Sequence, residues 1–285
     1  MARTIEGGDP EEGGMDVSFY FIRHGKTLFN QRHLVQGWCD SPLVDEGVAV
    51  ARTMGAKLAG IDFAHAIASD KGRTCQTLAE LLDARAAARG EAACAGALLQ
   101  GAKRSMPASD NVSPSTDGAA AYLAALDDAL VSGSPNRACD LPLSCDWRLR
   151  EWCYGDLEMQ SGEMLHQRLI EGFGAQLSFE EENERLPETA DNLARLDKSG
   201  RAERFADIEE RVLSFLQEVG DATLEAGGGN VLAVTHAFTI RTLMWLLDRA
   251  RINQPRIILN GSLTRIDYDG ERFTMREIGV LEPQA

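Results

Sequence analysis

Residues 16–27 read DVSFYFIRHGKT, an apolar and aromatic-rich run that ends abruptly in polar residues. A short run of this kind, stopped by loop residues, is typical of a buried β-strand, here over residues 16–22. Arg23, His24 and Gly25 follow it directly. In open parallel sheets, ligands bind at the carboxyl ends of the strands. The stretch therefore predicts a strand with a candidate functional site at its end.

The order of strand and helix recurs along the chain, which favours a parallel sheet covered by helices. Two further short runs predict strands, HAIASD (65–70) and VLAVT (231–235). Apolar residues at helical spacing predict helices over 41–60, 73–88 and 239–250, the first with Asp45 as N-cap and a stop at Gly60. Two runs, IILNGSLTRIDY (257–268) and ERFTMREI (271–278), predict a hairpin or a pair of edge strands. We expect an α/β fold of three layers, with a mostly parallel central sheet and helices on both faces.

The middle of the chain is less regular. Residues from about 90 to 140 are rich in Ala, Ser, Gly and Pro, so we expect an inserted, partly helical or mobile segment with one helix at 117–132. Residues from about 160 to 225 read as a helical, cap-like segment with a polar break near LPETADN (186–192). We expect a disordered tail over residues 1–14, with the rest of the chain forming a single domain.

Composition excludes several function classes. The 285 residues include 29 basic and 44 acidic side chains, and the resulting net charge of −15 repels nucleic acid and anionic membranes. We find no apolar stretch of about 18 residues and no signal peptide, so we expect a cytoplasmic protein. The six cysteines are scattered without metal-type spacing, which indicates reduced packing residues.

Charged and imidazole side chains follow three predicted strand ends. Arg23 and His24 come after the first strand, Arg73 after the second, and His236 after the strand that ends at Thr235. Guanidinium groups suit the paired oxygens of a phosphoryl group, and their charge disfavours protonation of a neighbouring imidazole. We expect His24 to stay neutral near pH 7 and to attack phosphorus through a ring nitrogen. Gly25 would let the backbone turn sharply and approach the phosphate.

A leaving alkoxide also needs a proton. Glu151, in LREWCYGDLE (149–158), is the candidate general acid, because Trp152 and Tyr154 would desolvate it and raise its pKa. Asp156 and Glu158 are weaker candidates in the same loop.

Four separated blocks now resemble the histidine phosphatase superfamily, also called the phosphoglycerate mutase-like family. The blocks are FIRHGKTLFNQRHLVQGWCDSPLVDEG (21–47), ASDKGRTCQTLAELL (68–82), LREWCYGDLE (149–158) and VLAVTHAFTIRTL (231–243). A single RHG is weak evidence, because about one chain in thirty of this length carries it by chance, whereas four blocks in the family's order are specific.

The resemblance implies a role for each matching residue. His24 is similar to the nucleophile that becomes phosphohistidine, and Glu151 to the proton donor. Such enzymes need no metal or other cofactor, and they act on small phosphorylated substrates. The remaining matching positions form the phosphate pocket and its lining: Arg23, Arg73, His236, Asn30, Gln36 and the backbone amide of Ala237. The chain departs from the common pattern at Lys26, at Phe29 and in the stretch HAF (236–238), and Lys26 bears on substrate preference.

Four functions stay open at this point. The first is a phosphatase that hydrolyses a small phosphorylated metabolite. The second is a mutase, which needs additional cations downstream of the acidic loop. In this segment, residues 156–186, the only formally cationic side chains are Arg168 and Arg185. The third is a catalytically silent phosphate-binding protein, and the fourth a metal hydrolase using His24, His33 and His236. The lack of cations favours hydrolysis, and the oligomeric state stays open.

Overall fold

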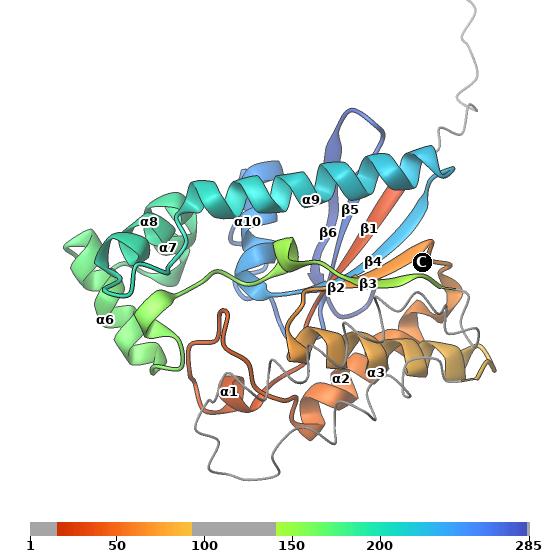
Figure 1. Ribbon diagram of the computed structural model, residues 1–285, viewed down its shortest axis with the longest axis horizontal. Helices are drawn as coiled ribbons and strands as arrows, with labels where there is room; N and C mark the ends of the chain where they lie inside the picture. Colours follow the sequence, from red (N-terminus) through yellow and green to blue (C-terminus); the bar gives the residue numbers. More distant parts are fainter. Residues whose placement is uncertain (1–15, 93–140, 284–285) are drawn as a thin grey trace, which may run out of the picture.

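The computed structural model describes residues 16–92 and 141–283 (Figure 1). The predicted tail over residues 1–14, most of the predicted insert and the predicted helix at 117–132 lie outside the described residues. Within the described ranges, the strands form one sheet and the helices pack around it.

The sheet has six strands in the order β3-β2-β4-β1-β5-β6. β3, β2, β4 and β1 pair in parallel, whereas β5 and β6 form an antiparallel edge beside β1. The α/β class and the mostly parallel sheet are therefore confirmed. The strands are β1 (Val17–Arg23), β2 (His65–Ala68), β3 (Leu143–Cys145), β4 (Gly229–Thr235), β5 (Leu263–Tyr268) and β6 (Phe273–Val280).

Helices cover both faces of the sheet. The helices are α1 (Leu28–Gln31), α2 (Asp45–Lys57), α3 (Gly72–Ala88), α6 (Gly162–Phe173), α7 (Phe179–Glu184), α8 (Leu186–Leu196), α9 (Phe205–Glu225) and α10 (Ala237–Leu247). Figure 1 shows α9 and α10 on one face, α2 and α3 on the other, and α6, α7 and α8 grouped at one end. Short 3₁₀ turns complete the described part: η1 (Leu58–Gly60), η2 (Trp147–Leu149), η3 (Gly155–Leu157) and η4 (Arg249–Arg251).

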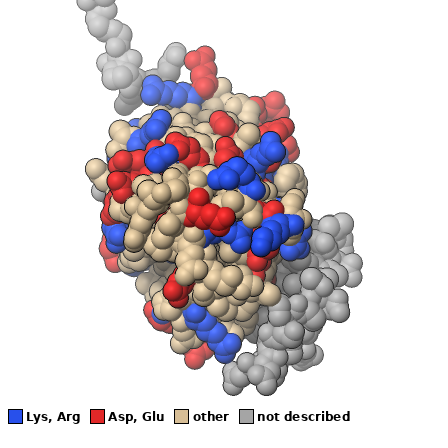
Figure 2. Space-filling model, turned by 90° about the vertical axis from the view of Figure 1, so that its left-hand side faces the viewer, with Lys and Arg blue, Asp and Glu red and all other residues tan. Residues whose placement is uncertain are grey.

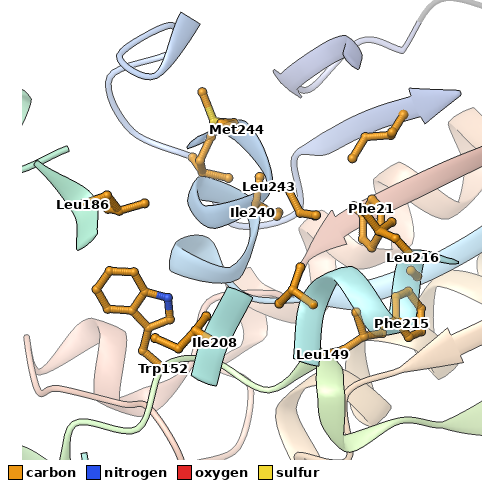
Figure 3. Close-up of a cluster of buried hydrophobic side chains, with 14 of the residues drawn as sticks. Phe21, Leu149, Trp152, Leu186, Ile208, Phe215, Leu216, Ile240, Leu243 and Met244 are labelled. Atoms are coloured by element: carbon orange, nitrogen blue, oxygen red, sulfur yellow. The ribbon is translucent and has the colours of Figure 1, made fainter. Parts of the chain in front are cut away.

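The central strand β1 is buried on both sides, which explains its unbroken apolar run. Successive strand side chains point to opposite faces. Phe19 and Phe21 accordingly join the core beneath α9 and α10, part of which Figure 3 shows. Tyr20 and Ile22 join the core beneath α2 and α3. This double burial fixes the direction of β1 and hence the position of the residues at its end.

The boundaries of the first long helix differ from the prediction. Asp45 is the first helical residue and Val44 is the N-cap, so the predicted N-cap was wrong by one position. Asp45 instead lies in the first turn, where a carboxylate interacts favourably with the helix dipole. The helix ends at Lys57 and a 3₁₀ turn continues to Gly60.

The predicted polar break near LPETADN is also wrong, because helix α8 spans this stretch. Its proline lies in the first turn, where a missing N–H costs no helical hydrogen bond. Leu186, Ala190 and Leu193 are buried along one face and hold the helix in place. Strand β3 was not predicted, since its three residues are too few to show a pattern.

The described part of the chain has charged side chains of both signs on the face that Figure 2 shows, and it has no membrane-spanning helix. Figure 2, which faces the end with α6, α7 and α8, shows basic side chains interspersed with acidic ones. No helix in the described ranges is both long and apolar enough to cross a bilayer. Four cysteines fall within the described residues and are free thiols: Cys39, Cys75, Cys145 and Cys153.

Candidate active site

The ends of β1 and β4 bring the two predicted histidines together. Arg23, the last residue of β1, lies opposite Thr235, the last residue of β4. The backbone amide of His24 donates to the Thr235 carbonyl at 3.0 Å. The rings of His24 and His236 are consequently 5.1 Å apart between centroids. The predicted convergence of both imidazoles at one edge of the sheet is thus observed.

His24 presents a neutral ring with one nitrogen free for chemistry. Its Nδ1 lies 2.8 Å from the Gly25 carbonyl oxygen. A carbonyl only accepts, so Nδ1 carries the proton and Nε2 carries the lone pair. No hydrogen bond joins Nε2 to a residue in the described ranges. Burial, followed by the charges of Arg73 and Arg23, holds the pKa of His24 well below its usual value.

His236 is fully buried and has the opposite tautomer. Arg73 Nη2 donates to its Nδ1 at 3.0 Å, and a guanidinium can only donate. Nε2 therefore carries the proton and donates to Ser69 Oγ at 3.0 Å. Burial, then the charges of Arg73 and His24, lower its pKa well below the usual value. Both imidazoles are therefore neutral at physiological pH.

Arg73 connects His236 to the loop that follows α1. Its Nη1 donates to the Cys39 carbonyl at 2.8 Å and to Asp40 Oδ1 at 3.0 Å. Its Nη2 donates to the Gly37 carbonyl at 2.8 Å. The side chain is completely buried, and its Nε has no hydrogen-bond partner among the described residues.

Arg23, like Arg73, has an Nε–H group without a hydrogen-bond acceptor among the described residues. Its Nη1 donates to the Ile258 carbonyl, and its buried Nε has no partner within the described ranges. Burial lowers the pKa of Arg23 to about 10. The guanidinium is still positively charged near neutral pH. Two cationic groups near His24 therefore each retain an N–H that has no acceptor.

Glu151 belongs to the loop between η2 and η3, and its side chain lies against the first turn of α10. Its carboxylate accepts from the backbone amides of Phe238, Thr239 and Trp152, each at 3.1 Å. Burial raises the pKa of Glu151, while these amides and the arginines oppose that shift. The predicted desolvation is therefore present. Ala237 begins the helix, so its amide is one of the first-turn N–H groups that have no acceptor within the helix.

The amide side chains predicted to line the pocket contact neighbouring loop residues. Asn30 Oδ1 accepts from the Thr27 amide at 3.2 Å. Gln36 Oε1 accepts from Thr27 Oγ1 at 2.7 Å, and Gln36 Nε2 donates to Ser41 Oγ at 3.1 Å. These contacts hold the loop after β1, and a direct contact with substrate stays a prediction for both residues.

Gly25 is required for a packing reason that the sequence did not indicate, while its predicted approach to phosphate stays a prediction. A Cβ at this position would lie 2.4 Å from the Gly47 carbonyl oxygen. A Cβ on Gly47 would in turn lie 2.1 Å from the Lys26 carbonyl oxygen. The two glycines therefore let α2 approach the loop after β1. The structure explains Gly25 by this packing of backbone on backbone.

Glu158 is the residue whose role the sequence did not indicate. Its Oε2 accepts from the amides of Gly37 (3.1 Å) and Cys39 (3.0 Å). Its Oε1 accepts from the amides of Trp38 (2.8 Å) and Tyr154 (3.0 Å). Both oxygens are thus committed to holding the loop that Arg73 also contacts. No local sequence signal predicts these contacts, because three of the four donors lie more than a hundred positions away in the chain.

The remaining acidic and basic candidates have local partners. Asp156 pairs with Arg168 at 3.0 Å. Lys26 pairs with Glu46 on α2 at 2.8 Å. His33, named for a metal site, is exposed at the surface. Across residues 16–92 and 141–283, no group of three or more His, Cys, Asp or Glu side chains could hold a metal ion.

Comparison with known proteins gives three related results. The family model for the histidine phosphatase superfamily (branch 1) matches residues 19–91 and 133–280. "Probable phosphoglycerate mutase GpmB" of Proteus mirabilis (strain HI4320) is 43% identical over 61 residues, which are 21% of this chain and 28% of that protein. The crystal structure of phosphoglycerate mutase from Bacillus anthracis str. Sterne superimposes with a TM-score of 0.69 at 26% identity, covering 94% of this chain and 95% of that chain.

One further curated relative and one further solved structure are also similar to this chain. "Probable phosphoglycerate mutase GpmB" of Yersinia pestis (strain Pestoides F) is 40% identical over 68 residues, which are 24% of this chain and 32% of that protein. Bacillus stearothermophilus YhfR shares the fold, with a TM-score of 0.58, 24% identity and coverage of 94% and 98%. The chain therefore aligns with less than a third of the length of these curated relatives. Because the family model matches well over half of the residues, the chain belongs to the histidine phosphatase superfamily.

Proposed function

We propose that the protein is a phosphatase that hydrolyses a small phosphorylated metabolite through a phosphohistidine at His24. One observation carries this proposal. His24 is neutral, its Nε2 lone pair has no partner among the described residues, and His236 and Arg73 lie beside it. This is the state that a nitrogen nucleophile needs for attack on phosphorus.

The reaction has two steps. In the first, the Nε2 lone pair forms a bond to phosphorus, the ester P–O bond breaks, and Glu151 gives its proton to the leaving oxygen. In the second, water attacks phosphorus, Glu151 takes up the water's proton, and the P–N bond breaks to release inorganic phosphate and free His24. The raised pKa of Glu151 supports the acid role, because a protonated carboxyl is needed at the start.

The cationic groups support charge stabilisation during this transfer. Arg23 and Arg73 each have a buried Nε–H without an acceptor among the described residues. A buried donor without an acceptor costs on the order of 1–3 kcal/mol, which a phosphoryl oxygen would recover. Guanidinium groups beside the transferred phosphoryl group stabilise its developing charge most strongly in a buried site. Arg73 also donates to His236 at 3.0 Å, which fixes its guanidinium beside the histidine pair.

The surroundings support hydrolysis over mutase chemistry. A mutase needs free cations to hold a doubly phosphorylated intermediate. Arg168 is paired with Asp156, and Arg185 is paired with Glu188. The only two formal cations of the segment 156–186 are therefore already neutralised by neighbouring carboxylates.

The experiment measures phosphate release from a general aryl phosphate by the wild type and by His24→Ala. We expect His24→Ala to abolish turnover, while the matched variant His33→Ala, at an exposed histidine, retains it. Wild type quenched during turnover should carry an acid-labile, alkali-stable phosphoryl group. Unchanged turnover by His24→Ala would overturn the proposal and favour a different nucleophile.

Three outcomes would each identify one of the alternative functions. Interconversion of 2- and 3-phosphoglycerate that is faster than phosphate release would identify a mutase. Activity that disappears in chelator and returns with zinc would identify a metal hydrolase. No turnover of any phosphomonoester by the wild type would identify a silent phosphate-binding protein.

A further inference from the structure

A cavity of about 220 Å³ lies beside the candidate active site, against helices α6, α7 and α8. Aromatic and aliphatic side chains supply most of its wall. The principal ones are Trp152, Tyr154, Leu165, Leu169, Phe179 and Phe238. The reaction proposed above assigns no role to this cavity.

The cavity shares its inner wall with the site. Trp152 and Phe238 both line it, and their backbone amides donate to the Glu151 carboxylate at 3.1 Å. Their rings lie 5.0 Å apart between centroids. Tyr154, three positions after Glu151 in the same loop, also lines it. The residues that hold the Glu151 carboxylate are thus also part of the cavity wall, which places the cavity next to the group proposed to protonate the leaving oxygen.

The size of the cavity suits a ring. An apolar cavity of about 150 Å³ holds benzene. A cavity of about 220 Å³ therefore has room for a benzene-sized ring and a short linker. Ligand pockets lined mainly by apolar side chains take apolar ligand surface, and a few polar groups fix its orientation.

The polar groups on the wall disfavour an acidic leaving group. Glu182 and His166 line the cavity, and none of its described lining residues is Lys or Arg. An ionised Glu182 would repel a substrate carboxylate, and among the described residues no guanidinium or ammonium group lines the cavity to offset that repulsion. A phosphorylated sugar acid would place its carboxylate near this residue.

We propose that this cavity binds an apolar, ring-bearing leaving group, so that the preferred substrates are arylalkyl phosphomonoesters rather than phosphorylated sugar acids. The proposal rests on the phosphatase function proposed above. It assigns substrate selection to helices α6, α7 and α8, and it assigns the chemistry to the ends of β1 and β4.

The test compares kcat/KM of the wild type for 2-phenylethyl phosphate, ethyl phosphate and 3-phosphoglycerate. The first two leave as primary alcohols of similar acidity, so their ratio reports binding of the ring rather than leaving-group chemistry. Burying a phenyl ring predicts a preference on the order of 10- to 100-fold for 2-phenylethyl phosphate over ethyl phosphate. It also predicts that 3-phosphoglycerate is the poorer substrate relative to 2-phenylethyl phosphate.

Variants locate the preference in the cavity. Leu165→Trp fills the cavity and should reduce the ratio of the two alkyl esters to about 3-fold or less. Met164→Trp adds the same side chain at the neighbouring position of α6, which is 43% exposed and outside the cavity lining, and should leave the ratio unchanged. If Leu165→Trp does not fold, inhibition of ethyl phosphate turnover by 2-phenylethanol still tests the wild type.

The outcomes distinguish the two proposals. Turnover of both alkyl esters with equal kcat/KM, or with 3-phosphoglycerate preferred, overturns the assignment of the cavity and leaves the phosphatase function standing. An equal loss of preference in Met164→Trp and Leu165→Trp also overturns the assignment. No turnover of any of the three esters overturns the phosphatase function itself, and the cavity assignment falls with it.

Discussion

Replacing Glu158 by glutamine should destabilise the protein strongly, although the two side chains have the same shape. The carboxylate accepts four backbone amides, two on each oxygen. Glutamine converts one oxygen into an NH₂ donor, so two amides lose their acceptor and face another donor. Each buried donor left unmatched costs about 1–3 kcal/mol. We therefore expect Glu158→Gln to lower the free energy of unfolding by about 4 kcal/mol.

The same variant should impair activity through the loop that Glu158 holds. The carbonyls of Gly37 and Cys39 accept from Arg73, which in turn donates to His236. A loop displaced by about 1 Å would move Arg73 and can reduce catalysis by roughly 100-fold. We expect kcat to fall by at least about 10-fold under conditions in which the variant is still folded.

Urea unfolding followed by circular dichroism measures the stability change, and steady-state kinetics below the transition measures kcat. Glu171→Gln, at an exposed position of α6, is the matched control and should stay within about 0.5 kcal/mol of the wild type. A loss below about 1 kcal/mol for Glu158→Gln would refute the reasoning, because the amides would then have found other partners at little cost.

Four further predictions concern the site and the loop that holds it. Glu151→Gln should slow hydrolysis of alkyl phosphates more than that of p-nitrophenyl phosphate, since only the former need a proton on the leaving oxygen; an equal loss for both, measured as kcat/KM, would argue against the acid role. The wild type should also lose kcat as the pH rises through the raised pKa of Glu151, and this limb should be absent from the pH profile of Glu151→Gln. The pKa of His236 is lowered in the folded protein. Between that lowered pKa and about 6.5, the unfolded chain therefore binds a proton at His236 that the folded protein does not bind. The free energy of unfolding consequently decreases as the pH falls through this window. His236→Asn should reduce this slope by about 1.4 kcal/mol per pH unit in urea titrations at several pH values, and an unchanged slope would contradict a neutral buried ring. Gly37→Ala should lower the free energy of unfolding by more than about 2 kcal/mol in urea titration, because its Cβ would lie 2.1 Å from the Trp152 carbonyl oxygen; a near-neutral effect would show that the loop can move aside.

Local patterns predicted the main strands and helices well, because each depends on residues close in sequence. The unbroken apolar run of β1 reports burial on both faces of the sheet. The same reasoning failed at α8, where a polar stretch hides Leu186, Ala190 and Leu193 at helical spacing. It also failed at β3, whose three residues are stabilised by pairing with β2 rather than by their own pattern.

The sequence by itself determined the α/β class, the family and the pair of histidines that follow two strands. These conclusions need only short stretches, since a strand end and its next residue are neighbours in the chain. Only the tertiary structure decided how the site is held and what surrounds it. Glu158 reaches Gly37 across 121 positions, and the cavity draws its wall from residues between Trp152 and Phe238. Such contacts depend on how separate elements pack, and no periodicity within one element encodes them.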